Sequence, residues 1–168
     1  NNRSRGLGDV YKRQGGDGMK LYIDGVLVGS NAYNTSSFSD WGTGQNFYLG
    51  KANWNDPYFD GEMDQISVHN VALNGTMISE VFASGRNSDL RNLSSIVGSM
   101  IGYWKVNEGS GTVLYDLVSN AGDATLFNGV LWETSSSVEG YLAQFDDVDD
   151  FNGYINSCLL YTSPSPRD

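Results

Sequence analysis

The sequence predicts an all-β protein, an antiparallel β-sandwich with one short helix. Short apolar runs recur along the chain with the two-residue alternation of strands that bury one face. Turn-forming residues separate these runs, with 21 Gly but only 3 Pro in 168 residues. Many short strands joined by Gly- and Asp-rich turns are typical of antiparallel sheets that pack face to face.

A β-hairpin is expected near the start of the chain. Residues 19–24 alternate, with Met, Leu and Ile on one face and Lys, Tyr and Asp on the other. Asp24-Gly25 then precedes a second apolar run at residues 26–28. An Asp-Gly pair between two such runs is the strongest short-range signal for a hairpin.

The remaining elements follow from the same patterns. Polar stretches predict loops at residues 30–44 and 51–61. Further strands are expected at residues 46–50, 62–69, 100–106, 125–126, 130–132 and 141–145.

One helix is expected over residues 73–83. Asn74 is a suitable N-cap, and Gly85 is suited to end the helix. Ile78 and the pair Val81-Phe82 form its apolar face.

Composition excludes some classes of function. The chain has 20 acidic and 10 basic residues and a net charge of −10, so it lacks the positive charge that a nucleic-acid backbone requires. No apolar run approaches the roughly 20 residues of a membrane-spanning helix. The acidity suits a secreted protein or a cation binder.

Both ends of the chain are interpreted as adapter-like artefacts, at residues 1–14 and 158–168. A single DNA string encodes Ser4–Gln14 on one strand and Cys158–Arg167 on the other, which is not expected of two unrelated peptides. The sequence is therefore expected to be a fragment of a longer gene. Because its only Cys lies in the second of these segments, cysteine content does not indicate a redox compartment.

Two sets of motifs between these ends resemble the laminin-G-like domains of the concanavalin A-like lectin/glucanase superfamily. The first set resembles the C-terminal half of such a domain and comprises Lys20–Gly25, Phe47–Gly50, Phe59–Val68 and the helix that ends at Gly85. The second set resembles the N-terminal half and comprises Gly102–Gly111, Tyr115-Asp116, Asn120–Leu126 and Phe145–Phe151.

The order of the two sets suggests the organisation of the chain. Residues 15–85 are expected to be the C-terminal half of one domain, residues 86–96 a linker, and residues 97–157 the N-terminal half of the next domain. The resemblance implies a jelly-roll-type sandwich, here incomplete or circularly permuted. It also implies neighbouring laminin-G-like repeats in the parent chain.

A calcium site is expected around Asp64. On a regular strand this residue shares a face with apolar Ile66 and Val68, where a carboxylate is costly unless it is paired or binds a metal. Hard oxygen ligands suit Ca²⁺, and the resemblance implies a structural Ca²⁺ held by an Asp of this strand. Asp116 and Asn120 are the candidates for further ligands. The alternative is that Asp64 caps a turn or is turned outward by a bulge.

Aromatic residues in the predicted loops and nearby are candidates for ligand binding. Aromatic rings combine apolar area with a polar rim and stack on sugar rings. Core packing is the alternative role, and it is favoured for Trp104 and Trp132. The candidate ligand-binding residues are Trp41, Tyr48, Trp54 and Tyr58.

No catalytic residue is predicted. The nearest match to a hydrolase strand pairs Glu62 with Asp64 but lacks a third carboxylate. His69 has no nucleophile or metal-ligand partner in the sequence and is expected to be a strand or loop residue with a satisfied hydrogen bond.

Three functions are compatible with these features. The first is a non-catalytic extracellular binding or adhesion module for a glycan or a protein partner. The second is a carbohydrate-binding module appended to a polysaccharide-degrading enzyme, and the third is a structural spacer in a tandem array. The first is favoured, at the cell surface or secreted.

Overall fold

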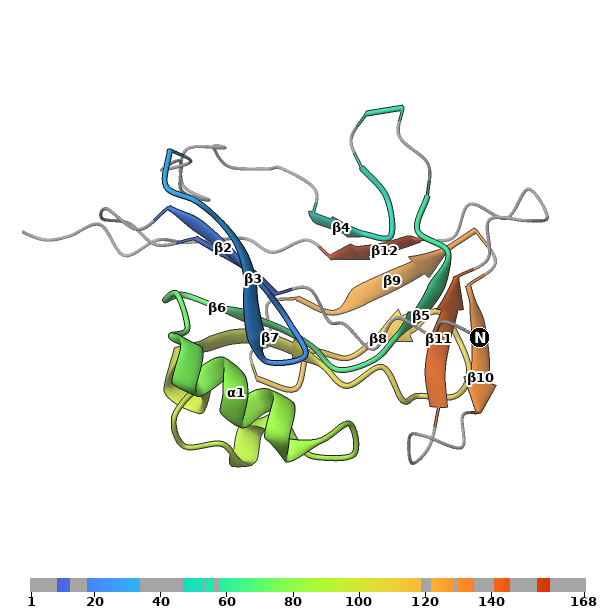
Figure 1. The fold of residues 1–168 in the computed structure, drawn as a ribbon. Helices are drawn as coiled ribbons and strands as arrows, with labels where there is room; N and C mark the ends of the chain where they lie inside the picture. The colour runs from blue at the N-terminus through green and yellow to red at the C-terminus, as the bar shows by residue number, and fades with distance from the viewer. Residues whose placement is uncertain are drawn as a thin grey trace, which may run out of the picture. The chain divides into compact units, whose positions relative to one another are not determined.

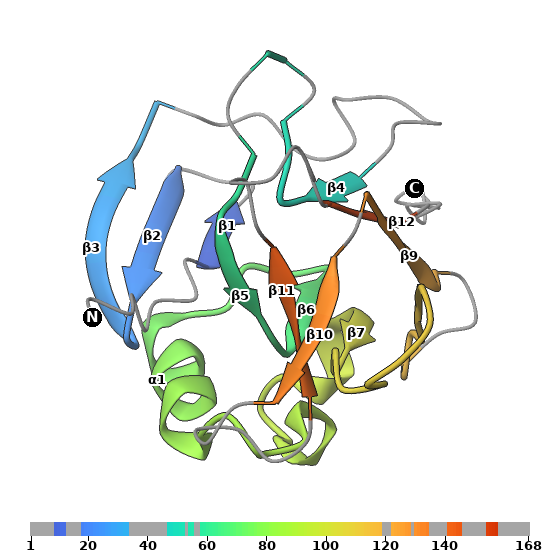
Figure 2. The ribbon, with the colours of Figure 1, turned by 90° about the vertical axis from the view of Figure 1, so that its right-hand side faces the viewer.

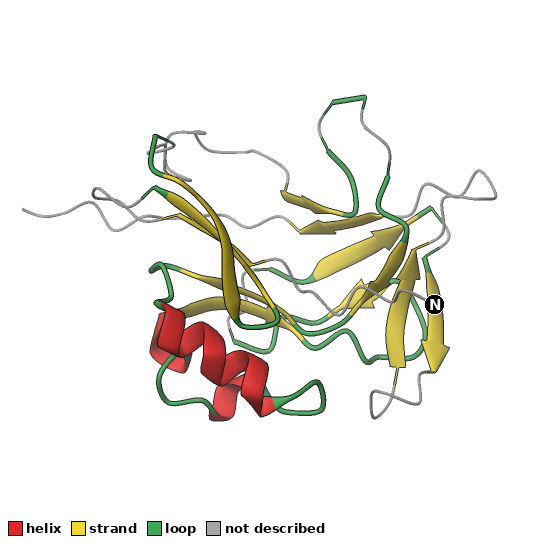
Figure 3. Cartoon of the chain, in the orientation of Figure 1, coloured by secondary structure: helices red, strands yellow, loops and turns green. Residues whose placement is uncertain are grey.

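A computed structural model describes nine parts of the chain, which are residues 9–12, 18–33, 47–52, 54–55, 58–118, 122–128, 130–134, 141–145 and 154–157. The described part is mostly β-structure with one α-helix, as Figure 3 shows by colour. This confirms the predicted all-β class.

The chain divides into two units. The first unit comprises Asn1–Trp41 and His69–Met100, and the second comprises Gly42–Val68 and Ile101–Asp168. Each unit is therefore assembled from segments that are not continuous in the sequence.

The first unit contains a three-stranded sheet in the order β1-β2-β3 (Figure 2). Its strands are β1 (Asp9–Lys12), β2 (Met19–Ile23) and β3 (Val26–Asn31), and both pairings are antiparallel. β1 lies in the segment interpreted as adapter-like. Its pairing with β2 does not test that interpretation.

The predicted hairpin is confirmed, but the side chain that it buries is not on the face that the sequence predicted to be apolar. Tyr22 is buried, whereas Ile23 is exposed. The pairing register shifts between Leu21 and Tyr22, so that Leu21 faces Gly29 and Tyr22 faces Leu27. This bulge interrupts the strict alternation on which the expected apolar face was based.

The predicted helix is confirmed as α1 (Gly75–Ser84). The Asn74 side chain accepts a hydrogen bond from the backbone N–H of Met77, and Gly85 is the C-cap. Ile78 is buried as expected, but Phe82 is more than half exposed.

Two 3₁₀ turns follow α1 in the first unit: η2 (Leu90–Asn92) and η3 (Val97–Ser99). The segment 86–96, which the sequence suggested as a linker, contains η2 and buries both Leu90 and Ile96.

The second unit contains two further sheets. One has the order β10-β11-β5 and the other β4-β12-β9-β8, and the pairings within both are antiparallel (Figure 1). The strands are β4 (Phe47–Leu49), β5 (Gly61–Met63), β8 (Val113–Leu114), β9 (Ala124–Phe127), β10 (Leu131–Thr134), β11 (Tyr141–Phe145) and β12 (Tyr154–Ser157). β6 (Ile66–His69) pairs with β7 (Met100–Trp104) in a separate two-stranded ladder.

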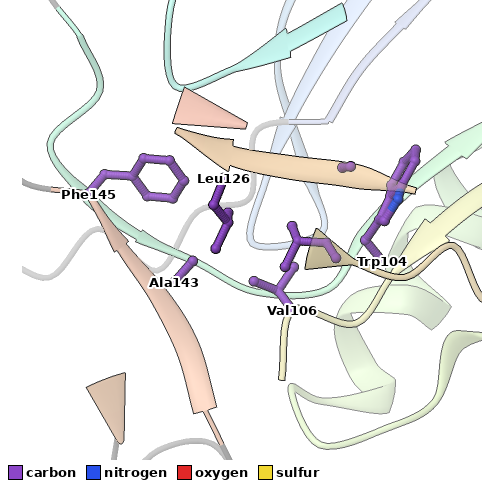
Figure 4. Packing of buried hydrophobic residues seen from close by; sticks show 7 residues of the cluster. Trp104, Val106, Leu126, Ala143 and Phe145 are labelled. Carbon is purple, nitrogen blue, oxygen red and sulfur yellow. The ribbon is translucent and has the colours of Figure 1, made fainter. Parts of the chain in front are cut away.

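Side chains from both sheets of the second unit meet in one hydrophobic core (Figure 4). The buried cluster includes Leu126 from β9 and Phe145 from β11, together with Trp104 and Val106. Trp132 packs against the cluster while partly exposed. Burial of side chains from two sheets against each other is the packing of a β-sandwich.

The predicted strand at residues 62–69 is interrupted. β5 ends at Met63 and β6 begins at Ile66. Between them Gln65 has a φ of 49°, in the left-handed region, and its N–H donates to the Lys105 carbonyl at 3.4 Å. A left-handed residue breaks the alternation of a strand. The sequence analysis placed Asp64 on the face of Ile66 and Val68 by assuming a regular strand, and that assumption does not hold.

Candidate functional site

The loop between β4 and β5 carries two of the four predicted ligand-binding residues, Trp54 and Tyr58, and a third, Tyr48, lies in β4 just before it. Its base is closed by a hydrogen bond from the Phe59 N–H to the Gly50 carbonyl, at 2.8 Å. The Phe59 ring also meets Phe145 of β11 edge to face, with ring centroids 5.8 Å apart. The start of the loop is fixed because β4 pairs with β12, and its end because β5 pairs with β11.

Two tyrosines of this region share one lysine. The Lys51 ammonium lies 4.6 Å from the centroid of the Tyr48 ring and 5.9 Å from that of Tyr58. Both distances are in the range of a cation–π interaction, and each ring is only partly exposed. Lys51 therefore links the strand residue to the loop residue and restricts both rings. The sequence prediction missed Lys51, although it lies three residues after Tyr48.

Trp54 lies in the same loop and is 79% exposed. Figures 1 and 2 show this loop extending beyond the ends of β4 and β5. An indole this exposed contributes little to folding, because most of its apolar area remains in water. Trp41, the fourth predicted ligand-binding residue, lies outside the described residues.

Asp116, a predicted calcium ligand, organises a turn in the second unit. Its Oδ1 accepts hydrogen bonds from the backbone N–H groups of Tyr103 and Val118, each at 3.0 Å. Its own N–H donates to Asp123 Oδ1 at 2.9 Å. The buried Trp104 indole donates to the neighbouring Gly122 carbonyl at 2.8 Å. These contacts give Asp116 a structural role that needs no metal.

The other predicted calcium ligands are not brought together with Asp116 by the described contacts. Asp64 is half-buried and follows β5 directly, and Asn120 lies outside the described residues. In the part of the chain that the structure describes, no group of three or more His, Cys, Asp or Glu side chains is placed to hold a metal ion. The described side chains alone therefore do not complete a calcium site, and calcium binding stays a prediction.

The single histidine lies in β6 and is only 8% exposed. Its Nδ1 is 2.9 Å from Ser99 Oγ, as expected for a satisfied strand histidine. Burial lowers the pKa of His69 below its usual 6.5, and a hydrogen bond to the backbone of Ile96 partly opposes this effect.

Residues 10–79 match the family model described as the concanavalin A-like lectin/glucanases superfamily, in its laminin-G group. This part of the chain is therefore similar to that superfamily. The match contains Tyr48, Trp54 and Tyr58, whereas Asp116 lies outside it. No curated protein and no solved structure matches the chain.

The match agrees with the sandwich packing, and laminin-G-like domains are in general binding modules. It does not identify a ligand, because one fold supports many functions. Among the described helices, none is long and apolar enough to cross a bilayer.

Proposed function

We propose that this chain is a non-catalytic extracellular module that binds glycan through the loop between β4 and β5. The observation that carries the proposal is the 79% exposure of Trp54 on a loop whose two ends are fixed by strand pairing. An exposed indole on a loop whose ends are held by strand pairing presents a flat apolar face, which suits the apolar face of a sugar ring.

The surroundings of Trp54 support a binding role. Tyr48 and Tyr58 are restricted by Lys51, so they lose little conformational freedom when a ligand arrives. Their hydroxyl groups and the Lys51 ammonium supply polar groups that sugar hydroxyls can reach. Groups for stacking and for hydrogen bonding therefore lie within one short segment, residues 48–58.

Glycan-array binding of the full chain tests this proposal. We expect Trp54→Ala to weaken binding by at least about tenfold, or ~1.4 kcal/mol, since it removes the largest apolar face of the site. Tyr33→Ala is the matched control, because Tyr33 is an even more exposed aromatic (96%) in the first unit. Equal binding by wild type and Trp54→Ala, or equal losses in the two variants, would refute the assignment.

A protein partner is the second candidate, favoured by a different surface. β3 is an edge strand of its sheet, and its first three residues, Val26, Leu27 and Val28, are all exposed. Uncovered apolar edge strands are typical sites of strand addition by a partner. Binding to an extracellular protein that Leu27→Lys abolishes and Trp54→Ala leaves unchanged would favour this candidate.

The remaining alternatives concern the parent chain. An adjoining hydrolase domain in the flanking sequence would favour a carbohydrate-binding module of a polysaccharide-degrading enzyme. Further laminin-G-like repeats combined with no binding to glycan or protein would favour a structural spacer.

A further inference from the structure

Residues 69–100 of the first unit form an excursion whose two ends lie side by side. The Asn70 N–H donates to the Ser99 carbonyl at 2.9 Å. Between these ends the chain forms α1, η2 and η3. The excursion buries apolar side chains of its own, namely Leu73, Ile78, Leu90, Ile96 and Met100.

A short hydrogen-bond chain joins the ends of the excursion. His69 Nδ1 lies 2.9 Å from Ser99 Oγ, and Ser99 Oγ donates to the Ile96 carbonyl at 2.8 Å. The Ser99 hydroxyl therefore lies between the His69 imidazole and the Ile96 carbonyl.

We propose that His69 is a pH-sensitive clasp, which holds residues 69–100 closed while neutral and loosens them when it is protonated at mildly acidic pH. The proposal rests on three features of the structure. The imidazole is buried, its partner Ser99 belongs to the opposite end of the excursion, and Asn70, the residue after His69, donates the closing backbone hydrogen bond to the Ser99 carbonyl.

The electrostatic surroundings favour the neutral form. His69 is the only charged or chargeable residue of β6, η3 carries none, and the only titratable residue of β7 is the buried phenol Tyr103. In η2, Arg91 pairs with its own neighbour Asp89, with Nε and Oδ1 2.9 Å apart. A positive charge on His69 is therefore opposed chiefly by loss of hydration, and this effect outweighs the Ile96 carbonyl.

The direction of the pH effect follows from the lowered pKa. The closed form binds the His69 proton more weakly than the open chain, whose histidine titrates near 6.5. The clasp is therefore strongest above pH 6.5 and weakens as the pH falls toward the pKa of the closed form. Between these two pKa values, each pH unit increases the open population by up to about tenfold.

NMR of the full chain tests the clasp directly, because the chain has one histidine and hence one imidazole Hε1 signal. We expect that signal to titrate below pH 6.5. We expect the protection of the Asn70 amide against hydrogen exchange, corrected for intrinsic rates, to fall severalfold between pH 7.5 and 5.5. The amide of Leu142 in β11 is the internal reference and should keep its protection.

Two variants separate the clasp from general acid sensitivity. His69→Asn should remove the pH dependence at Asn70, and Ser99→Ala should lower protection already at pH 7.5. Ser94→Ala, at an exposed serine of the same excursion, should behave as wild type. The proposal fails if His69 titrates at or above pH 6.5, if Asn70 protection does not change with pH in wild type, or if it changes equally in His69→Asn.

Discussion

Asp116 shows how one side chain can define a turn of this fold. Its Oδ1 accepts from two backbone N–H groups, of which one belongs to Tyr103 of β7 and one lies two residues further along the turn. Tyr103 is fully buried, so its N–H has few other acceptors within reach. The residue that the sequence suggested as a metal ligand is thus already engaged in holding β7 to the segment before β9.

We expect Asp116→Ala to destabilise the chain by about 2 kcal/mol, since it leaves two N–H groups without their charged acceptor. Chemical denaturation measures the loss. Asp60→Ala, which removes an exposed carboxylate of the same unit, should change the unfolding free energy by less than about 0.5 kcal/mol. Equal effects of the two substitutions would show that Asp116 acts only through its charge.

At the scale of single elements, the β2–β3 hairpin was the feature best predicted from sequence. Asp24 and Gly25 have φ values of 52° and 75°, the pair of left-handed residues that a type I′ turn requires. Gly25 is required for a second reason, because a Cβ there would lie 3.1 Å from the Phe82 Cβ of α1. The exposed Phe82 therefore covers the turn rather than the interior.

Gly25→Ala should destabilise the hairpin by about 1 kcal/mol or more, since it combines a left-handed φ with close contact to Phe82. Gly29→Ala is the matched control within the same hairpin, because no atom lies within 4 Å of its added Cβ and its φ is not left-handed. Thermal unfolding of both variants checks the difference. A larger loss for Gly29→Ala would contradict this account of the turn.

The errors of sequence prediction also arose at the scale of elements. Gln65 adopts a φ of 49°, which this residue type does not favour, so no sequence signal marked the break between β5 and β6. The His69–Ser99 pair was equally hidden, because the two residues are 30 positions apart. The loop between β4 and β5, by contrast, was recognisable from the composition of residues 51–61, although the role of Lys51 was not.

At the scale of the whole molecule, we expect calcium to stabilise the fold. If a site forms around Asp64, millimolar Ca²⁺ should raise the unfolding temperature. An ion at 100 times its dissociation constant adds about 2.7 kcal/mol. Asp64→Ala should abolish the shift and Asp60→Ala should keep it, as followed by thermal scans after chelation. An unfolding temperature that does not change with Ca²⁺ would refute the metal site but would not contradict the fold.

The fold class was predictable because it depends on many short strands and turns, and a few misplaced boundaries do not alter it. Strand partners were not predictable in the same way. Alternation shows that a segment is a strand but not that Glu62 of β5 lies opposite Gln144 of β11. Such pairings depend on packing within the second unit, where Phe145 and Leu126 share one core.

The pairing of β4 with β12 has a consequence for biosynthesis. Leu49 lies opposite Ile155, so β4 leaves the ribosome about a hundred residues before its partner is made. Until then its hydrogen-bonding edge is open to other nascent chains, as is that of β5, whose partner is also distant. Long-range pairing of this kind slows folding. We therefore expect the unpaired edges of β4 and β5 to make the unfinished chain prone to association while the rest is synthesised.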